Sequence, residues 1–178
     1  MSESPFIVPI PNSYWVHSGT LLAGEYPGSR DDESSTDRLT NFIKSGIDTF
    51  IDLTQDGELP SYSDLLQEHA RGNNIDVTYT RLPIVDFGLP SFKQMTMILD
   101  KVDRSLESGK KVYVHCWGGV GRTGTVIGCY LVRHGAKPLD ALDQLSAWWQ
   151  SIPKRIFHPR TPETDEQIQF VLNWKENS

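Results

Sequence analysis

His115-Cys116-Trp117-Gly118-Gly119-Val120-Gly121-Arg122-Thr123 is the stretch of sequence that decides the fold of this chain. It follows a short β-branched run, 111–115, which predicts a strand, and it leads into 122–134, which predicts a helix. A helix that begins directly after a glycine-rich loop presents free N–H groups and partial positive charge to that loop. The stretch therefore predicts an anion-binding loop between a strand and a helix.

Cys116 and Arg122, with five residues between them, form the core of this motif. At average composition, that spacing alone arises by chance in about one chain in ten. A histidine before the cysteine, glycines in the third and fifth places after it, and a threonine after the arginine lower the expectation well below about one in ten thousand. The combination is therefore specific, although the spacing alone is not.

Each residue type in the motif has a distinct chemical role. Glycines allow backbone conformations that turn successive N–H groups inward, which makes a nest for an anion. A thiol at Cys116 is expected to ionise there and attack phosphorus in line, giving a phosphocysteine intermediate. Arg122 can return over the loop and bind two phosphate oxygens. The residues predicted to bind the substrate phosphate are Trp117, Gly118, Gly119, Val120, Gly121 and Arg122.

Outside this stretch, strands alternate with helices. A helix capped by Ser34 or Ser35 and ended by Gly46 is predicted, and Asp31-Asp32-Glu33 before it is expected to be a solvated turn. The other predicted strands cover 20–23, 47–53 and 75–82, and the other helices cover 61–71, 91–108, 139–149 and 162–174. We expect an α/β fold with a central, mostly parallel sheet flanked by helices, as a single domain over 14–178 after an N-terminal extension over 1–13. Ligands of such sheets bind at the carboxyl ends of strands, where the 115–123 loop lies.

The bulk composition indicates a soluble globular protein and limits its partners. The net charge of −6 argues against nucleic acid, because phosphate backbones favour basic surfaces. The two cysteines predict no disulfide framework. Residues 1–5 lack the pattern of a signal peptide, and no apolar run approaches the roughly 20 residues of a membrane span. We expect a cytoplasmic monomer without a cofactor. No metal site is expected, because ligand-like spacing is missing at His17, His69 and His134.

The pattern His115-Cys116-x-x-Gly119-x-x-Arg122-Thr123 resembles the signature of the protein tyrosine phosphatase superfamily. The short length and the layout are most similar to its dual-specificity branch. Segment 21–27 resembles the opening strand and turn of such domains, and 162–170 resembles their closing helix. The resemblance implies hydrolysis of phosphotyrosine and phosphoserine or phosphothreonine on proteins, or of a small phosphate-ester substrate.

The family also uses a general acid on a mobile upstream loop, and the segment 83–90 matches that loop through Asp86. The chemistry requires such an acid, because an alkoxide leaves poorly unless it is protonated, and the same carboxylate can later activate water. Asp76 and Asp100 are alternatives. The position of Asp86 in a loop between two prolines favours it, because the others lie in a predicted strand and helix.

The resemblance assigns further roles. Thr123 would help to release the thiolate, and His115 would orient the loop without acting as a base. In the larger tyrosine-specific enzymes a glutamine positions the hydrolytic water. By alignment Glu163 stands at that place here, while Gln167 matches the second glutamine of the segment. The residue that positions the water is thus left open.

Several features have two readings. The basic residues of 154–160 form either a solvated loop or a rim that receives substrate phosphate, with Arg160 as the best candidate. Cys129 is expected to be a buried core thiol, with a disulfide to Cys116 under oxidation as the alternative. Trp148 and Trp149 are expected to pack in the core, with one ring exposed.

Other functions are also possible for the motif. A nucleotide-binding P-loop is excluded, because Cys116 and Arg122 replace its glycine and its lysine pair. Rhodanese or arsenate reductase would not explain Asp86 together with His115 and Thr123. A non-catalytic phosphoprotein-binding module usually lacks the Cys, Arg or Asp that this chain has. Inositol phosphates and phosphoinositides remain alternative substrates, although the loop carries none of the lysines that are usual in enzymes for them.

Overall fold

The computed structural model describes residues 7–176 and is built around one five-stranded sheet. The strands are β1 (Ser13–His17), β2 (Leu21–Gly24), β3 (Thr49–Asp52), β4 (Thr78–Arg81) and β5 (Val112–His115). Their order in the sheet is β1-β2-β5-β3-β4. The edge strand β1 is antiparallel to β2, and the other three pairings are parallel. The predicted α/β class with a mostly parallel sheet is confirmed.

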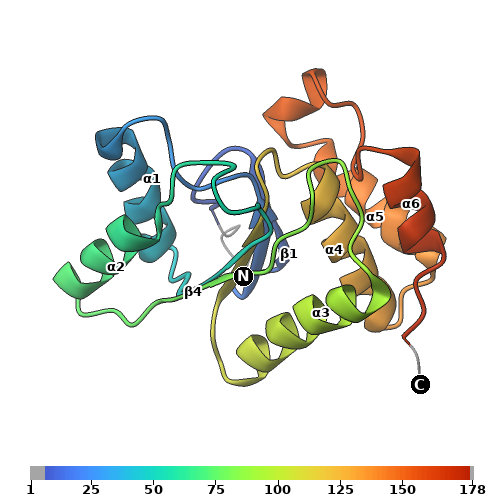
Figure 1. The fold of residues 1–178 in the computed structure, drawn as a ribbon, viewed down its shortest axis with the longest axis horizontal. Helices are drawn as coiled ribbons and strands as arrows, with labels where there is room; N and C mark the ends of the chain where they lie inside the picture. Colours follow the sequence, from blue (N-terminus) through green and yellow to red (C-terminus); the bar gives the residue numbers. More distant parts are fainter. Residues whose placement is uncertain (1–6, 177–178) are drawn as a thin grey trace, which may run out of the picture.

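Helices cover both faces of this sheet (Figure 1). They are α1 (Asp32–Lys44), α2 (Ser63–Gly72), α3 (Phe92–Glu107), α4 (Gly121–Arg133), α5 (Pro138–Trp149) and α6 (Asp165–Leu172), with a short 3₁₀ helix, η1 (Pro153–Ile156). Helices α1 and α2 lie on one side, while α3 to α6 lie on the other. The chain is thus a three-layer α/β domain.

Strand β5 shows why the sheet carries a core on each face. Val112 and Val114 lie in the cluster with residues of α3 to α6, whereas Tyr113 lies in the cluster with residues of α1 and α2. Side chains of a strand alternate between faces, so a strand covered on both sides needs apolar residues in succession. That requirement explains the continuous apolar run before His115.

The start of α1 differs from the prediction. Asp31 is its N-cap, and its carboxylate accepts a hydrogen bond from the Ser34 N–H at 2.8 Å. Asp32 and Glu33 form the first helical turn, where negative charge is favourable. Residues 31–33 are exposed as expected, but the predicted turn and the cap at Ser34 or Ser35 are wrong, because Asp31 caps a helix that begins at Asp32.

The sequence reading missed the edge strand β1. Tyr14 and Val16 are buried there while His17 is exposed, an alternation typical of a half-covered strand. The division into an extension over 1–13 and a domain over 14–178 stays a proposal. Residues 1–6 and 177–178, and with them the expectation about a signal peptide over 1–5, lie outside the described residues.

The parallel strands bring three connecting loops to one edge. His115 at the end of β5 pairs with Gly24 of β2 on one side and with Asp52 of β3 on the other. The loops that follow β3, β4 and β5 carry Glu58, Asp86 and Cys116, respectively. This carboxyl edge is where ligands of parallel sheets bind.

Candidate active site

Cys116 is the first residue after β5 and is 2% exposed. The Gly119 N–H donates a hydrogen bond to its Sγ at 3.3 Å. Helix α4 begins at Gly121, and no side chain caps its N-terminus. The first N–H groups of α4 are therefore available to an anion bound beside the thiol.

Gly119 is the position of the loop that requires glycine. Its φ is 72°, in the left-handed region, and a Cβ there would lie 2.5 Å from the Gly24 carbonyl carbon. At Gly121 a Cβ would meet the Gln167 amide at 2.9 Å, so a side chain there would have to displace Gln167 from its position at the α6 cap. Gly118 has neither constraint.

Arg122 is buried beneath the loop and held on several sides. Its guanidinium donates to both carboxylate oxygens of Glu58, at 2.8 and 2.5 Å, and to the Ile84 carbonyl at 3.1 Å. It also lies 3.0 Å from Oδ1 of Asp86. Burial opposes the charged form of Glu58, but hydrogen bonds from Arg122 outweigh it, so the pKa of Glu58 is lowered. Glu58 is thus an anion, and its carboxylate orients the Arg122 guanidinium.

Glu58 was missed by the sequence reading. A usable signal existed, because Glu58 lies in the loop after the predicted strand 47–53, and such loops meet at one edge of a parallel sheet. No residue of the 115–123 motif indicates that Glu58 is the partner of Arg122.

His115 links the loop to the opposite core. Its Nδ1 lies 3.0 Å from the Cys116 carbonyl, and its Nε2 lies 2.6 Å from the Tyr62 hydroxyl. These partners fit a neutral ring that donates from Nδ1 and accepts at Nε2. Burial lowers the pKa of His115, which keeps the ring neutral. The geometry supports an orienting role and not that of a base.

This neutrality predicts a pH effect on stability. The folded pKa of His115 lies below its ordinary value of 6.5, so the unfolded chain takes up a proton first. The contribution of His115 to the free energy of unfolding should be complete above about pH 6.5 and be lost as the pH falls below it. NMR titration of the ring should give a folded-state midpoint below 6.5. A folded-state midpoint near 6.5 for His115 would contradict this assignment.

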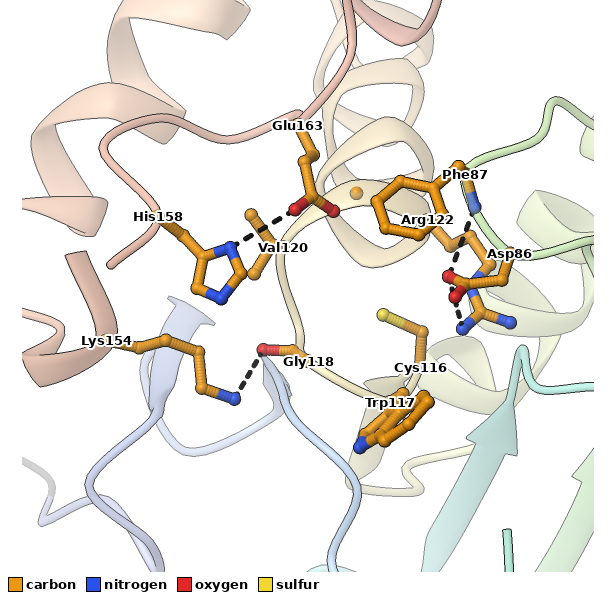
Figure 2. A pocket seen from close by; sticks show the side chains of 11 residues that line it. Asp86, Phe87, Cys116, Trp117, Gly118, Val120, Arg122, Lys154, His158 and Glu163 are labelled. Carbon is orange, nitrogen blue, oxygen red and sulfur yellow. Dashed lines mark hydrogen bonds and ion pairs between the residues drawn. The ribbon is translucent and has the colours of Figure 1, made fainter. Parts of the chain in front are cut away.

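Asp86 lies on the loop between β4 and α3, facing Arg122 and Cys116 (Figure 2). It is 43% exposed, and its Oδ1 accepts the Phe87 N–H at 3.1 Å. The alternative acids lie elsewhere: Asp76 is nearly fully exposed beside Lys110, and Asp100 pairs with basic residues on α3 and α4. Asp86 is therefore the carboxylate of the three that can reach a group bound at the thiol.

A cavity of about 280 Å³ opens above Cys116 (Figure 2). Trp117, 54% exposed, and Phe87, 62% exposed, form two of its walls. Phe87, Lys154, His158 and Glu163 were not predicted as site residues, although all four lie in segments already singled out and Glu163 aligns with the water-positioning glutamine of the larger enzymes. The lining residues are Asp86, Phe87, Cys116, Trp117, Gly118, Val120, Gly121, Arg122, Lys154, His158 and Glu163.

The basic side chains that line the cavity, other than Arg122, already have partners. The Lys154 ammonium lies 2.5 Å from Glu25 and donates to the Gly118 carbonyl at 3.1 Å. His158 Nδ1 lies 3.1 Å from Glu163. Arg160, the predicted rim residue, is not among the lining residues, and its guanidinium pairs with Asp165 at 2.8 Å.

Gln167 and Thr123 also lie outside the cavity. Gln167 is fully buried, and its side chain closes a capping box at the start of α6 and donates to the Gly88 carbonyl at 3.3 Å. The Thr123 hydroxyl donates to the Gly24 carbonyl at 3.4 Å. Gln167 thus joins the 83–90 loop to α6, and Thr123 joins the start of α4 to the end of β2.

The structure also places the other residues for which the sequence allowed two interpretations. Cys129 is a free, fully buried thiol in the core, and burial raises its pKa. Trp149 is buried and its indole N–H donates to the His158 carbonyl at 2.7 Å, while Trp148 stacks on Tyr14. Within 7–176, no group of three or more His, Cys, Asp or Glu side chains is placed to hold a metal ion. No helix in that range has the length and apolarity to cross a membrane.

A buried thiol that accepts a loop N–H, an arginine and a carboxylate thus converge on one cavity. The family model described as "Swiss Army Knife protein, DSP-PTPase phosphatase domain" matches residues 11–171. The chain belongs to this family of dual-specificity-type phosphatase domains.

Similar proteins support the family. An uncharacterized protein of Methanocaldococcus jannaschii is 30% identical over 94 residues, 52% of this chain and 56% of that protein. The chain thus matches about half the length of that relative. Protein tyrosine phosphatase domain-containing protein 1 of Mus musculus is 35% identical over 130 residues, 67% of this chain and 17% of that protein.

Among solved structures, a glycine-to-alanine mutant of Tk-PTP matches with a TM-score of 0.69 and 26% identity, covering 90% of this chain and 92% of that chain. Two others share the fold alone. PTPMT1 in complex with PI(5)P matches with a TM-score of 0.66 and 19% identity, covering 90% of this chain and 92% of that chain. The PP-IP phosphatase SIW14 of S. cerevisiae matches with a TM-score of 0.69 and 14% identity, covering 96% of this chain and 90% of that chain.

Proposed function

We propose that this protein hydrolyses phosphotyrosine and phosphoserine or phosphothreonine of proteins through a phosphocysteine intermediate at Cys116. The observation that carries the proposal is the cavity in which Cys116, Arg122 and Asp86 converge. The proposal includes a cytoplasmic monomer that needs no cofactor.

In the first step, the loop N–H groups and Arg122 bind the phosphate, and the Cys116 thiolate attacks phosphorus in line. The S–P bond forms while the P–O bond to the alcohol breaks, and Asp86 donates its proton to the leaving oxygen. In the second step, water attacks phosphorus, its proton passes to Asp86, and Cys116 leaves as the thiolate. Inorganic phosphate is then released.

Two features favour a protein monoester as the substrate. The exposed rings of Trp117 and Phe87 lie on opposite sides of the Cys116 sulfur, where they can contact a phenyl ring (Figure 2). Glu25 neutralises Lys154 and Glu163 pairs with His158, so the cavity has little spare positive charge for a second phosphate.

Inositol phosphates and phosphoinositides form the second candidate class. Its support is the fold shared with PTPMT1, solved in complex with PI(5)P, and with the PP-IP phosphatase SIW14. A non-catalytic phosphoprotein-binding module is less well supported, because nucleophile, arginine and acid all converge on the cavity.

A substrate panel tests the proposal. Phosphotyrosine, phosphoserine and phosphothreonine peptides should be turned over with higher kcat/KM than inositol phosphates or phosphoinositide vesicles. Turnover should survive EDTA, and orthovanadate should inhibit it. Exclusive turnover of polyphosphorylated inositol substrates would overturn the choice of substrate class while leaving the chemistry intact.

Asp86→Asn should lower kcat for a phosphoserine peptide by roughly 10²-fold, because the alkoxide then leaves without a proton. The loss should be smaller for p-nitrophenyl phosphate, whose leaving group needs little protonation. Steady-state kinetics on both substrates measure the difference, with the exposed Asp76→Asn as the matched control. Equal losses on both substrates would argue against Asp86 as the acid.

A further inference from the structure

A second hollow, of about 440 Å³, lies between the start of α3 and α6. Leu89 and Phe92 line one side of it, and Phe170 of α6 lines the other. Leu89 is 43% exposed and Phe92 is 45% exposed, so both present apolar surface to solvent. Apolar side chains gathered in a concave place with a polar rim are typical of a binding site. We call this hollow, with its apolar residues Leu89, Phe92 and Phe170, the apolar groove.

The walls of the apolar groove are fixed by their neighbours. The Phe92 ring stacks on the Phe170 ring with centroids 5.2 Å apart, and on the Trp174 ring with centroids 5.4 Å apart. Trp174 is 2% exposed and Phe170 is 9% exposed, so the core holds both rings. The buried Gln167 side chain donates to the Gly88 carbonyl at 3.3 Å and ties the loop before α3 to α6. A ligand would therefore meet a preformed groove, which lowers the entropy lost on binding.

The apolar groove continues from the cavity of Cys116 along two segments (Figure 1). In the loop between β4 and α3, residues 86–87 line the cavity and Leu89 lines the groove. On the other side, Glu163 lines the cavity and residues 165–166 line the groove. Three residues of chain span at most about 10 Å. An extended substrate with its phosphate at the cysteine can therefore reach the groove with a side chain three or four residues away.

The rim of the apolar groove is acidic. Asp165 is 82% exposed and pairs with Arg160 at 2.8 Å. Glu166 is also exposed, and within residues 7–176 it has no ion-pair partner. A carboxylate beside apolar surface attracts a cationic group of a ligand and repels an anionic one. The rim thus favours a polypeptide with a lysine or arginine over an anionic lipid surface or a polyphosphorylated inositol.

We propose that the apolar groove binds an apolar side chain of the substrate protein, three or four residues from the phosphorylated residue, while Glu166 pairs with a neighbouring Lys or Arg. The inference rests on the proposed function and specifies its substrate class. The substrate is a phosphoprotein whose phosphorylated residue lies in an extended segment with an apolar and a basic residue nearby. The groove is remote from the reacting atoms, so the contact lowers KM and leaves kcat unchanged.

A set of phosphopeptides measures this preference. Each peptide carries one phosphotyrosine in a flexible background of glycine and serine, with leucine or alanine three or four residues away on either side. The wild type should show a kcat/KM about 10-fold higher for leucine than for alanine at one of these places, the scale of burying a leucine side chain after the cost of ordering it. The absence of a gain from leucine on either side would overturn the inference.

Phe92→Ala tests the apolar wall. Phe92 is the first residue of α3, where alanine is compatible with the helix. The variant should prefer leucine over alanine by less than about twofold. The preference is a ratio of two kcat/KM values within one protein, so a general loss of stability or of catalysis cancels from it.

Glu166→Lys tests the rim. With leucine in the peptide, the wild type should favour a neighbouring lysine over a neighbouring glutamate by about two- to fivefold, the scale of an exposed ion pair. Glu166→Lys should favour the glutamate peptide instead. Glu107→Lys makes the same change of charge at the exposed end of α3 and should keep both wild-type preferences.

The variants also separate the alternatives. Wild-type preferences in both Phe92→Ala and Glu166→Lys would show that the leucine binds elsewhere. A loss of turnover on phosphoinositide vesicles but on no peptide in Phe92→Ala would show that the groove holds an acyl chain. Either result would refute the inference alone. Turnover of inositol phosphates without turnover of any phosphopeptide would refute the proposed function itself, and the role of the groove with it.

Discussion

Cys116→Ser is expected to reduce kcat for p-nitrophenyl phosphate by on the order of 10⁴-fold or more, the scale of losing an enzyme nucleophile. A serine hydroxyl keeps its proton in the same N–H nest, so the nest no longer provides an anion that can attack phosphorus. The rest of the cradle stays in place, because Sγ accepts one hydrogen bond, from Gly119, which a hydroxyl can also accept. The variant should therefore still bind inorganic phosphate while it forms no covalent phosphoenzyme.

Cys129→Ala is the matched control for this experiment. Cys129 is buried in α4 away from the cavity, so its loss should leave kcat within about twofold while it lowers stability by about 1 kcal/mol. Stopped assays and urea unfolding of both variants separate chemistry from folding. Retention of most activity by Cys116→Ser would show that Cys116 is not the nucleophile.

Arg122→Lys should lower kcat/KM by about 10²- to 10³-fold, the scale of losing one preorganised donor at a developing charge. A lysine keeps the positive charge that Glu58 needs, but it lacks the planar fork that binds two phosphate oxygens. The protein should therefore fold and yet bind orthovanadate more weakly. Steady-state kinetics with vanadate inhibition constants provide the measurement.

Arg122→Met tests the other half of this pairing. Glu58 then remains largely buried without its cation, which should cost about 3 kcal/mol or more of unfolding free energy. Arg104→Lys on the surface of α3 should change neither stability nor activity. If Arg122→Lys kept wild-type kcat/KM and vanadate affinity, the assigned phosphate contact would be wrong.

The catalytic loop was predictable because its chemistry is local. Nine consecutive residues carry the proposed nucleophile, the loop N–H groups and the arginine, and the flanking patterns correctly predicted a strand and a helix. Asp86 came from a resemblance supported by the chemistry of a leaving group, and the structure places it 3.0 Å from Arg122.

The partners that the sequence did not predict depend on which loops meet at the edge of the sheet. Glu58 lies 64 residues before Arg122, and no local pattern joins the two. Lys154 and His158 reach the cavity from the segment between α5 and α6, whose course depends on packing. The edge strand β1 was missed because its alternation covers only a few residues.

The hydrogen bonds of His115 join two parts of the molecule that the sheet otherwise separates. Tyr62 belongs to the core beneath α1 and α2, whereas Cys116 belongs to the core beneath α3 to α6. Through Tyr62, His115 and the Cys116 carbonyl, the catalytic loop is tied to a layer that contributes no cavity wall. Local unfolding of α2 would release this tie, so the lifetime of the active loop is set partly by the opening rate of a distant helix.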